Sequence, residues 1–127
     1  MIYRVVDVSG TFTRAVSGTN HFDETVEAMS LGDVQVELRL EPNDANPHGI
    51  SAYVDGRQVG WLATEWTARD PWVRWMRRLD SAGIRPRFQG VHRLTTNGLG
   101  HHMINFDVPG KNDEKLVVIA NRLIKEK

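Results

Sequence analysis

Apolar and polar residues alternate between residues 34 and 40, which is the pattern of a strand with one buried face. The apolar set consists of Val34, Val36, Leu38 and Leu40. The strand is expected to end before Pro42, because proline has no N–H to donate to a neighbouring strand. Shorter runs rich in β-branched and aromatic residues predict further strands at 3–8, 11–16, 50–54, 57–62, 85–94 and 103–108.

The strands at 50–54 and 57–62 are separated by Asp55-Gly56. Both residues tolerate a positive φ, so this dipeptide predicts a tight hairpin turn. In the 85–94 segment we expect Phe88, Val91 and Leu94 to face the core. The pattern therefore predicts one hairpin with a defined turn and several strands whose pairing it leaves open.

From residue 70 onward, the apolar residues are spaced as on one face of a helix. Asp70 suits the N-cap position, Pro71 suits the first helical position, and Gly83 is a natural stop. The apolar stripe between them, at intervals of three and four residues, consists of Trp72, Trp75, Met76 and Leu79. The sequence therefore predicts an amphipathic helix between residues 70 and 83.

Three weaker helical signals occur elsewhere. Short helices are expected at 23–29 and from Thr64 to about Arg69. Residues 112–114 suit a helix start, and the apolar residues that follow share one helical face. A strand at 116–120 is the competing interpretation of that last segment.

These elements predict an α+β, strand-rich domain with about six strands and two or three packed helices. A length of 127 residues suits a single domain spanning 1–127, large enough to bury a core without covalent staples. The chain has no cysteine, which excludes disulfides and thiolate metal sites. No apolar run resembles a signal peptide or a membrane span, so we expect a cytoplasmic protein.

Charge is balanced over the whole chain but not along it. The formal net charge is zero, yet residues 69–93 hold seven arginines and two acidic residues. A neutral total argues against strong non-specific binding to DNA, although a local basic patch would survive the cancellation. The alternative interpretation is a solvated helix face.

No motif for catalysis or for binding a metal or cofactor is found in the sequence. The five histidines lack the HxH or HExxH spacing of a metal site. The chain also lacks a nucleophile-elbow motif, paired catalytic carboxylates and a phosphate-binding GxxxxGK[ST] loop. We therefore expect no enzymatic activity, no metal and no cofactor.

The segment 41–62 carries a family resemblance. It contains Glu41-Pro42-Asn43, then Ile50 and Tyr53, the Asp55-Gly56 turn and the run Val59-Gly60-Trp61-Leu62, followed by Glu65. This order resembles the signature of the HIRAN domain. The resemblance implies a small, partly open β-barrel similar to an OB-fold, with helices packed around it. It also implies binding of single-stranded DNA at a free 3′ end, beside a separate helicase or nuclease as a protein partner.

The resemblance includes departures at the family's binding positions. Ala45-Asn46 stands where the family usually has Tyr-Asp, Asn20-His21 replaces an arginine–aromatic pair, and Thr64 replaces a basic residue. Stacking on an aromatic ring contributes roughly 1–3 kcal/mol per base, so these positions matter for affinity. The residues expected at the cleft are Asn20, His21, Asn46, His48 and Trp61, with Arg69, Arg74, Arg85 and Arg87 supplying positive charge.

A protein-interaction module that has lost DNA binding is the alternative function. Its contact surface would be the arginine stripe of the helix after residue 70, or Trp66. Trp61 and Trp66 are open to either interpretation, as stacking platforms or as structural aromatics.

Overall fold

One long strand, β6 (Ile84–Leu94), organises the sheet of the computed structural model, which describes residues 2–65, 67–95, 101–110 and 113–125. β1 (Arg4–Val8) pairs with its first half in parallel, and β7 (His102–Val108) pairs with its second half in the antiparallel sense. β3 (Gly32–Leu40) runs antiparallel along the other edge of β6. Within the described ranges, β6 therefore has three strand neighbours.

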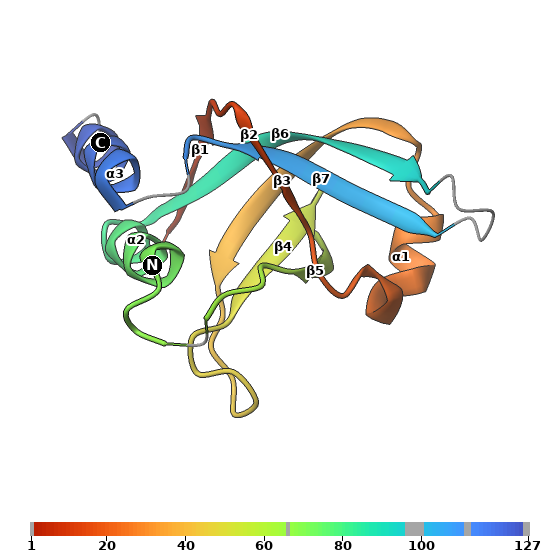
Figure 1. Ribbon diagram of the computed structural model, residues 1–127, viewed down its shortest axis with the longest axis horizontal. Helices are drawn as coiled ribbons and strands as arrows, with labels where there is room; N and C mark the ends of the chain where they lie inside the picture. The colour runs from red at the N-terminus through yellow and green to blue at the C-terminus, as the bar shows by residue number, and fades with distance from the viewer. Residues whose placement is uncertain (1, 66, 96–100, 111–112, 126–127) are drawn as a thin grey trace.

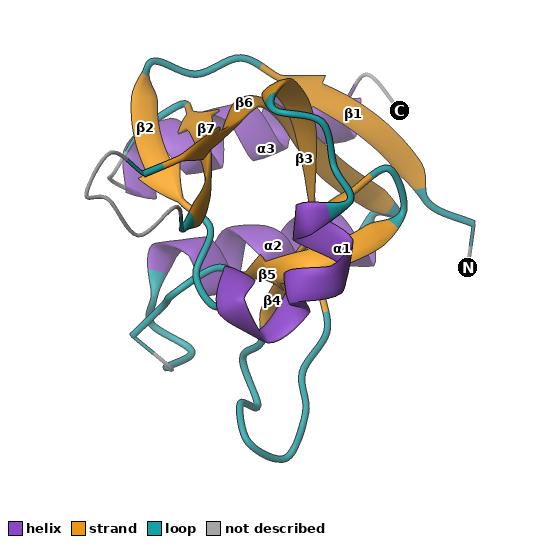
Figure 2. Ribbon diagram, turned by 90° about the vertical axis from the view of Figure 1, so that its right-hand side faces the viewer, coloured by secondary structure: helices purple, strands orange, loops and turns teal. Residues whose placement is uncertain are grey.

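The sheet extends from β3 through β4 (Ile50–Val54) to β5 (Arg57–Trp61), and from β7 to β2 (Phe12–Ala15). The described residues form seven strands, in the order β2-β7-β6-β3-β4-β5 with β1 on β6. The two ends of this order meet at one bridge, where Ser17 and Trp61 exchange two backbone hydrogen bonds of 2.8 and 3.0 Å. The sheet curves around a common interior (Figure 2), which confirms the predicted small, partly open barrel.

Helices lie at both ends of the barrel (Figure 1). The 3₁₀ helix η1 (Thr19–Phe22) and α1 (Asp23–Glu27) lie at one end, and α2 (Pro71–Ser81) and α3 (Asp113–Lys125) lie at the other. The rings of Trp72 and Trp75 meet edge to face with centroids 5.2 Å apart, and both contact Phe88 of β6. This aromatic cluster joins α2 to the barrel core. None of the described helices is long and apolar enough to cross a membrane.

Two local predictions are confirmed at the level of the backbone. Asp55 and Gly56 have φ angles of 51° and 77°, as the predicted hairpin turn requires. The Asp70 side chain accepts a hydrogen bond from Trp72 N–H at 2.8 Å, and Pro71 occupies the first turn of α2. Both features depend on neighbouring residues, so the sequence was sufficient to predict them.

The predicted short helix from Thr64 to about Arg69 is wrong. Residues 62–65 have no regular structure, and residues 67–69 form a bend and turn. The second Asp70 carboxylate oxygen accepts a hydrogen bond from Glu65 N–H at 2.8 Å, so the aspartate that caps α2 also holds the preceding segment. Trp66 lies outside the described residues.

The inward residues of β6 were predicted only in part. Phe88 is buried as expected, but Val91 faces outward and Leu94 is the last residue of the strand, and each is 43% exposed. Side chains alternate with a period of two along a strand, so burial of Phe88 selects residue 92 and excludes residue 91. The inward position belongs to His92, which is fully buried. Its Nδ1 lies 3.1 Å from the Ser30 carbonyl oxygen and its Nε2 lies 2.8 Å from His102 Nδ1.

The structure also decides between helix and strand near the C-terminus. Residues 113–125 form α3, and Leu116, Ala120 and Leu123 are buried on one face. The spacing of these residues, at four and three positions, is that of a helical face and not of a strand. The helix interpretation is therefore confirmed.

The two ends of the open sheet meet where two glycines permit close approach. A Cβ atom on Gly60 would overlap the carbonyl oxygen of Ser17 and a methyl group of Val16. A Cβ atom on Gly18 would overlap the Trp61 ring, and Gly18 also has a φ of 72°. Closure at this point therefore requires glycine at both positions.

We predict that Gly60→Ala lowers the free energy of unfolding by about 1–3 kcal/mol, because the added methyl group forces the Ser17 backbone away from β5. Urea unfolding monitored by circular dichroism measures the change. Ser9→Ala, at an exposed residue, is the control and should stay within about 0.5 kcal/mol of the parent. Equal stability of Gly60→Ala and the parent would contradict the role of this closure.

Candidate functional site

The connection between β3 and β4 is held in shape by its own hydrogen bonds. Glu41 N–H donates to the Gly49 carbonyl across the base of the loop at 2.9 Å. Asn43 and Asn46 exchange two backbone hydrogen bonds of 2.9 and 3.1 Å, and Asn46 Oδ1 accepts from His48 N–H at 3.0 Å. The side-chain amide nitrogens of Asn43 and Asn46 have no partner within the described part of the chain. The loop thus presents two amide donors from an ordered backbone.

Trp61 lies at the end of β5, directly beside this loop. Its backbone forms the bridge to Ser17, and its ring lies against the Cα of Gly18. The His21 ring, from η1, lies 5.4 Å from the Trp61 ring with an angle of 37° between the planes. The family resemblance placed these two residues at one cleft, and the structure brings their rings into contact.

A hollow of about 210 Å³ separates the loop from Trp61. It is lined by Glu41, Asn43, Ala45, Asn46, Gly49, Ile50, Ser51, Gln58 and Trp61. This volume is below the roughly 300–1,000 Å³ typical of pockets for drug-sized ligands. The hollow therefore suits one flat group rather than a large cofactor.

Glu41 brings a carboxylate to the wall of the hollow. Its Oε1 accepts a hydrogen bond of 2.5 Å from the Tyr53 hydroxyl. Burial, followed by this hydrogen bond and the charge of Glu41, raises the pKa of Tyr53 above its usual value of 10.0. Arg39 lies 3.9 Å above the Tyr53 ring and forms an ion pair with Glu37. Charged groups from β3 thus orient the tyrosine that contacts Glu41.

His48 joins the loop to α2. The Arg77 guanidinium lies 2.9 Å from His48 Nδ1. A guanidinium group can only donate, so His48 Nδ1 accepts in this contact and the ring proton is on Nε2. No ion pair of Arg77 occurs among the described residues. The contact therefore holds a cationic side chain beside the loop.

The arginines predicted to supply charge do not line the hollow. Arg85 and Arg87 lie on the outer face of β6, where Arg85 covers the Tyr3 ring at 3.9 Å and Arg87 pairs with Asp7 at 2.7 Å. Arg69 lies in the turn before α2, and Arg74 is exposed on α2. Asn20 is exposed in η1, next to His21. Of the nine predicted residues, Asn46 and Trp61 line the hollow, while His21 and His48 extend its surroundings.

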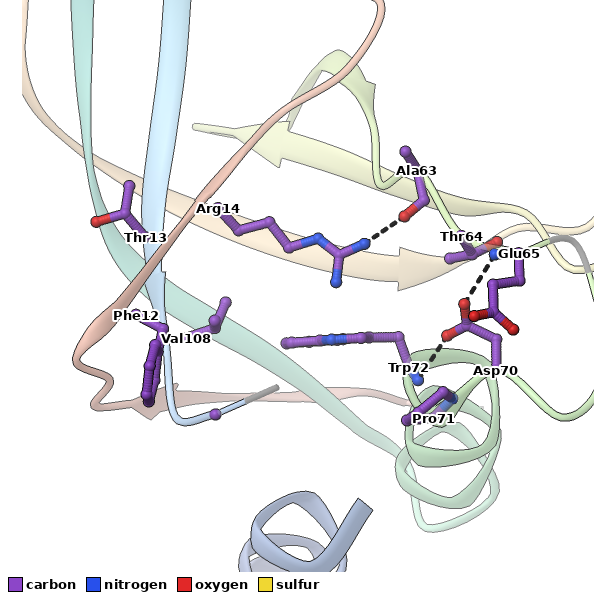
Figure 3. Close-up of a pocket in the computed structure, with 11 residues that line it drawn as sticks. Phe12, Thr13, Arg14, Ala63, Thr64, Glu65, Asp70, Pro71, Trp72 and Val108 are labelled. Atoms are coloured by element: carbon purple, nitrogen blue, oxygen red, sulfur yellow. Dashed lines mark hydrogen bonds between the residues drawn. The ribbon is translucent and has the colours of Figure 1, made fainter. Parts of the chain in front are cut away.

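A second and larger cavity, of about 460 Å³, lies between β2 and the start of α2 (Figure 3). Its lining residues are Phe12, Thr13, Arg14, Ala63, Thr64, Glu65, Asp70, Pro71, Trp72, Val108 and Gly110. Arg14 reaches across the cavity and donates to the Ala63 carbonyl, with its guanidinium carbon 5.3 Å from the Trp72 ring centre.

Sequence reasoning missed two features of these sites. Arg14 shares its strand parity with the buried Val16, and this inward charge was a usable signal in the pattern. The contact between Glu41 and Tyr53 had no such signal, because the two residues are 12 positions apart and meet only when β3 and β4 pair. Across the described ranges, no group of three or more histidine, aspartate or glutamate residues is placed to hold a metal ion.

Comparison of the chain with known protein families, curated proteins and solved structures finds no match. The resemblance of residues 41–62 to the HIRAN signature therefore stays a prediction from the sequence.

We predict that both tyrosines titrate above pH 10 in the folded protein. The hydrogen bond to Asp80 raises the pKa of Tyr3, and burial together with Glu41 raises that of Tyr53. Folding raises both values, so the stability that the protonated hydroxyls provide is complete below about pH 10 and is lost as the pH rises through the native values. Absorbance at 295 nm measures the titration, with the urea-unfolded chain as reference.

The chain contains only these two tyrosines, so Tyr3→Phe and Tyr53→Phe each leave a single curve to assign. A native midpoint equal to that of the unfolded chain in either variant would contradict the contact of the tyrosine that remains.

Proposed function

We propose that the protein binds the end of a single-stranded nucleic acid in the hollow between the 41–49 loop and Trp61. The observation that carries the proposal is the meeting of an aromatic surface, made of Trp61 and His21, with an amide-rich loop. Aromatic rings stack with bases of any sequence, whereas amide groups form hydrogen bonds with base edges and sugars. The HIRAN resemblance of residues 41–62 supports the same function.

The size and opening of the hollow favour a chain end over an internal nucleotide. About 210 Å³ accommodates one flat ring, so a single base enters while the rest of the strand stays outside. Trp61 forms one wall and Asn46 another, from β5 and from the loop respectively. A base stacked on Trp61 would thus lie within reach of the amide donors.

Glu41 gives the hollow a preference for a hydroxyl over a phosphate. The family's hydroxyl-binding acid is replaced by Asn46, but Glu41 provides a carboxylate in the same hollow. Its Oε1 is engaged by Tyr53, and its second oxygen makes no hydrogen bond among the described residues. A carboxylate accepts a hydrogen bond from a terminal hydroxyl and repels a terminal phosphate.

Positive charge near the hollow is modest. Arg77 is held beside the loop by His48, whereas Arg87 is paired with Asp7 on the outer face of β6. Few phosphate contacts give a shallow dependence of affinity on salt. The protein would therefore bind weakly along a strand and depend mainly on its end.

We predict that the folded protein binds a short single strand labelled at its 5′ end, and that a 3′-phosphate on the same strand weakens binding. Fluorescence anisotropy at low and moderate salt measures both affinities. His21→Ala should weaken binding roughly 5- to 150-fold, because it removes the ring that contacts Trp61 and leaves the Trp61 bridge in place.

His101→Ala is the matched control, because His101 is an exposed histidine that does not line the hollow. Its affinity should equal that of the parent. No binding at low salt by folded protein would overturn the proposal and favour the alternative, a protein-interaction module without DNA binding. Equal affinity of His21→Ala and the parent would contradict the role of the paired His21 and Trp61 rings as the stacking surface.

A further inference from the structure

We propose that the cavity between β2 and α2 is a separate binding site for a small organic anion, in which Arg14 binds the carboxylate or phosphate group. The cavity volume, about 460 Å³, lies within the range of small-molecule pockets. This site does not depend on the proposed nucleic-acid hollow, since no described residue lines both cavities.

Arg14 is positioned as a fixed donor. Its guanidinium donates to the Ala63 carbonyl on one side and lies over the Trp72 ring on the other, 5.3 Å from the ring centre. Trp72 is itself buried. A guanidinium group carries five N–H donors, so the bond to Ala63 leaves others for a ligand. Both contacts hold the side chain extended across the cavity before any ligand arrives (Figure 3).

The charge of Arg14 is incompletely balanced within the protein. Arg14 forms no ion pair within the part of the chain that the structure describes. Asp70 is near, but its two oxygens accept from the N–H groups of Glu65 and Trp72, and it lies at the N-terminus of α2. Burial lowers the pKa of Arg14, and the charge of Asp70 offsets only part of that effect. An anion placed on Arg14 would supply the missing charge.

The other residues that line the cavity determine which uncharged group can accompany the anion. The side chains of Phe12 and Val108 lie on one side of Arg14, and those of Glu65 and Asp70 lie on the opposite side (Figure 3). An anionic group on Arg14 would be repelled from the acidic side. Its carrier would therefore extend toward Phe12, which offers an aromatic surface. The preferred ligand carries one negative group on a flat apolar body.

Titration of the ¹⁵N-labelled full chain with four probes tests this site by NMR. Indole-3-acetate carries a carboxylate and thymidine 5′-monophosphate a phosphate, each on a molecule with a planar ring. Thymidine is the neutral counterpart of the monophosphate, and inorganic phosphate is an anion without a ring. We expect at least one of the two organic anions to cause saturable shifts at Arg14 Nε–H and the Thr64 amide. Thymidine and inorganic phosphate should bind at least roughly tenfold more weakly, as for the loss of one charge-assisted hydrogen bond.

Substitutions of Arg14 test whether the anion binds in this cavity. Arg14→Gln should weaken it roughly 10- to 100-fold, and Arg14→Lys should weaken it less, because lysine keeps the charge but loses the planar fork. Arg122→Gln, the same change at an exposed arginine of α3, is the matched control and should bind as the parent does. His21→Ala should also bind as the parent does, which separates this site from the Trp61 hollow.

Three outcomes of these titrations would overturn the proposal. It fails if neither organic anion shifts these signals at millimolar concentration, or if thymidine binds as tightly as the tighter-binding of the two anions. It also fails if Arg14→Lys and Arg14→Gln, each shown to be folded by circular dichroism, both keep the parent affinity.

Discussion

The barrel depends on one short contact, the backbone pairing of Ser17 with Trp61. Among the described residues, this is the only bridge between the two edges of the sheet, and it consists of two hydrogen bonds. Gly60 lets the Ser17 carbonyl approach β5, and Gly18 lets the Trp61 ring lie against the backbone. A sheet joined at one point has an opening beside that point, and this opening is where side chains from distant segments meet.

Both cavities lie along the segment that leaves this bridge. Trp61 walls the smaller hollow, and the Ala63 carbonyl, two residues later, receives the hydrogen bond from Arg14 at the larger cavity. Successive residues of an extended segment advance about 3.3 Å, so the two sites are near neighbours along the line where the two ends of the sheet meet. The same closure that stabilises the barrel thus positions an aromatic wall on one side and a half-buried cation on the other.

The arginine-rich region shows why charge counted along a chain does not define a surface. Seven arginines fall within residues 69–93, but the fold separates them. Arg87 pairs with Asp7 on the outer face of β6, Arg77 contacts His48 of the loop, and Arg78 donates to Asn121 of α3. Their partners come from three distant parts of the sequence. Local enrichment in positive charge therefore becomes a set of separate contacts.

The sequence by itself determined the features that depend on near neighbours: the Asp55-Gly56 turn, the capped start of α2 at Asp70 and the alternation of the β3 strand. These follow from backbone preferences and side-chain periods within a few residues. Only the tertiary structure decided that Val91 faces outward and that Arg14 meets Trp72. The physical reason is that strand pairing and barrel closure join residues far apart in the chain, and the choice of partners is made by the packing of the whole core.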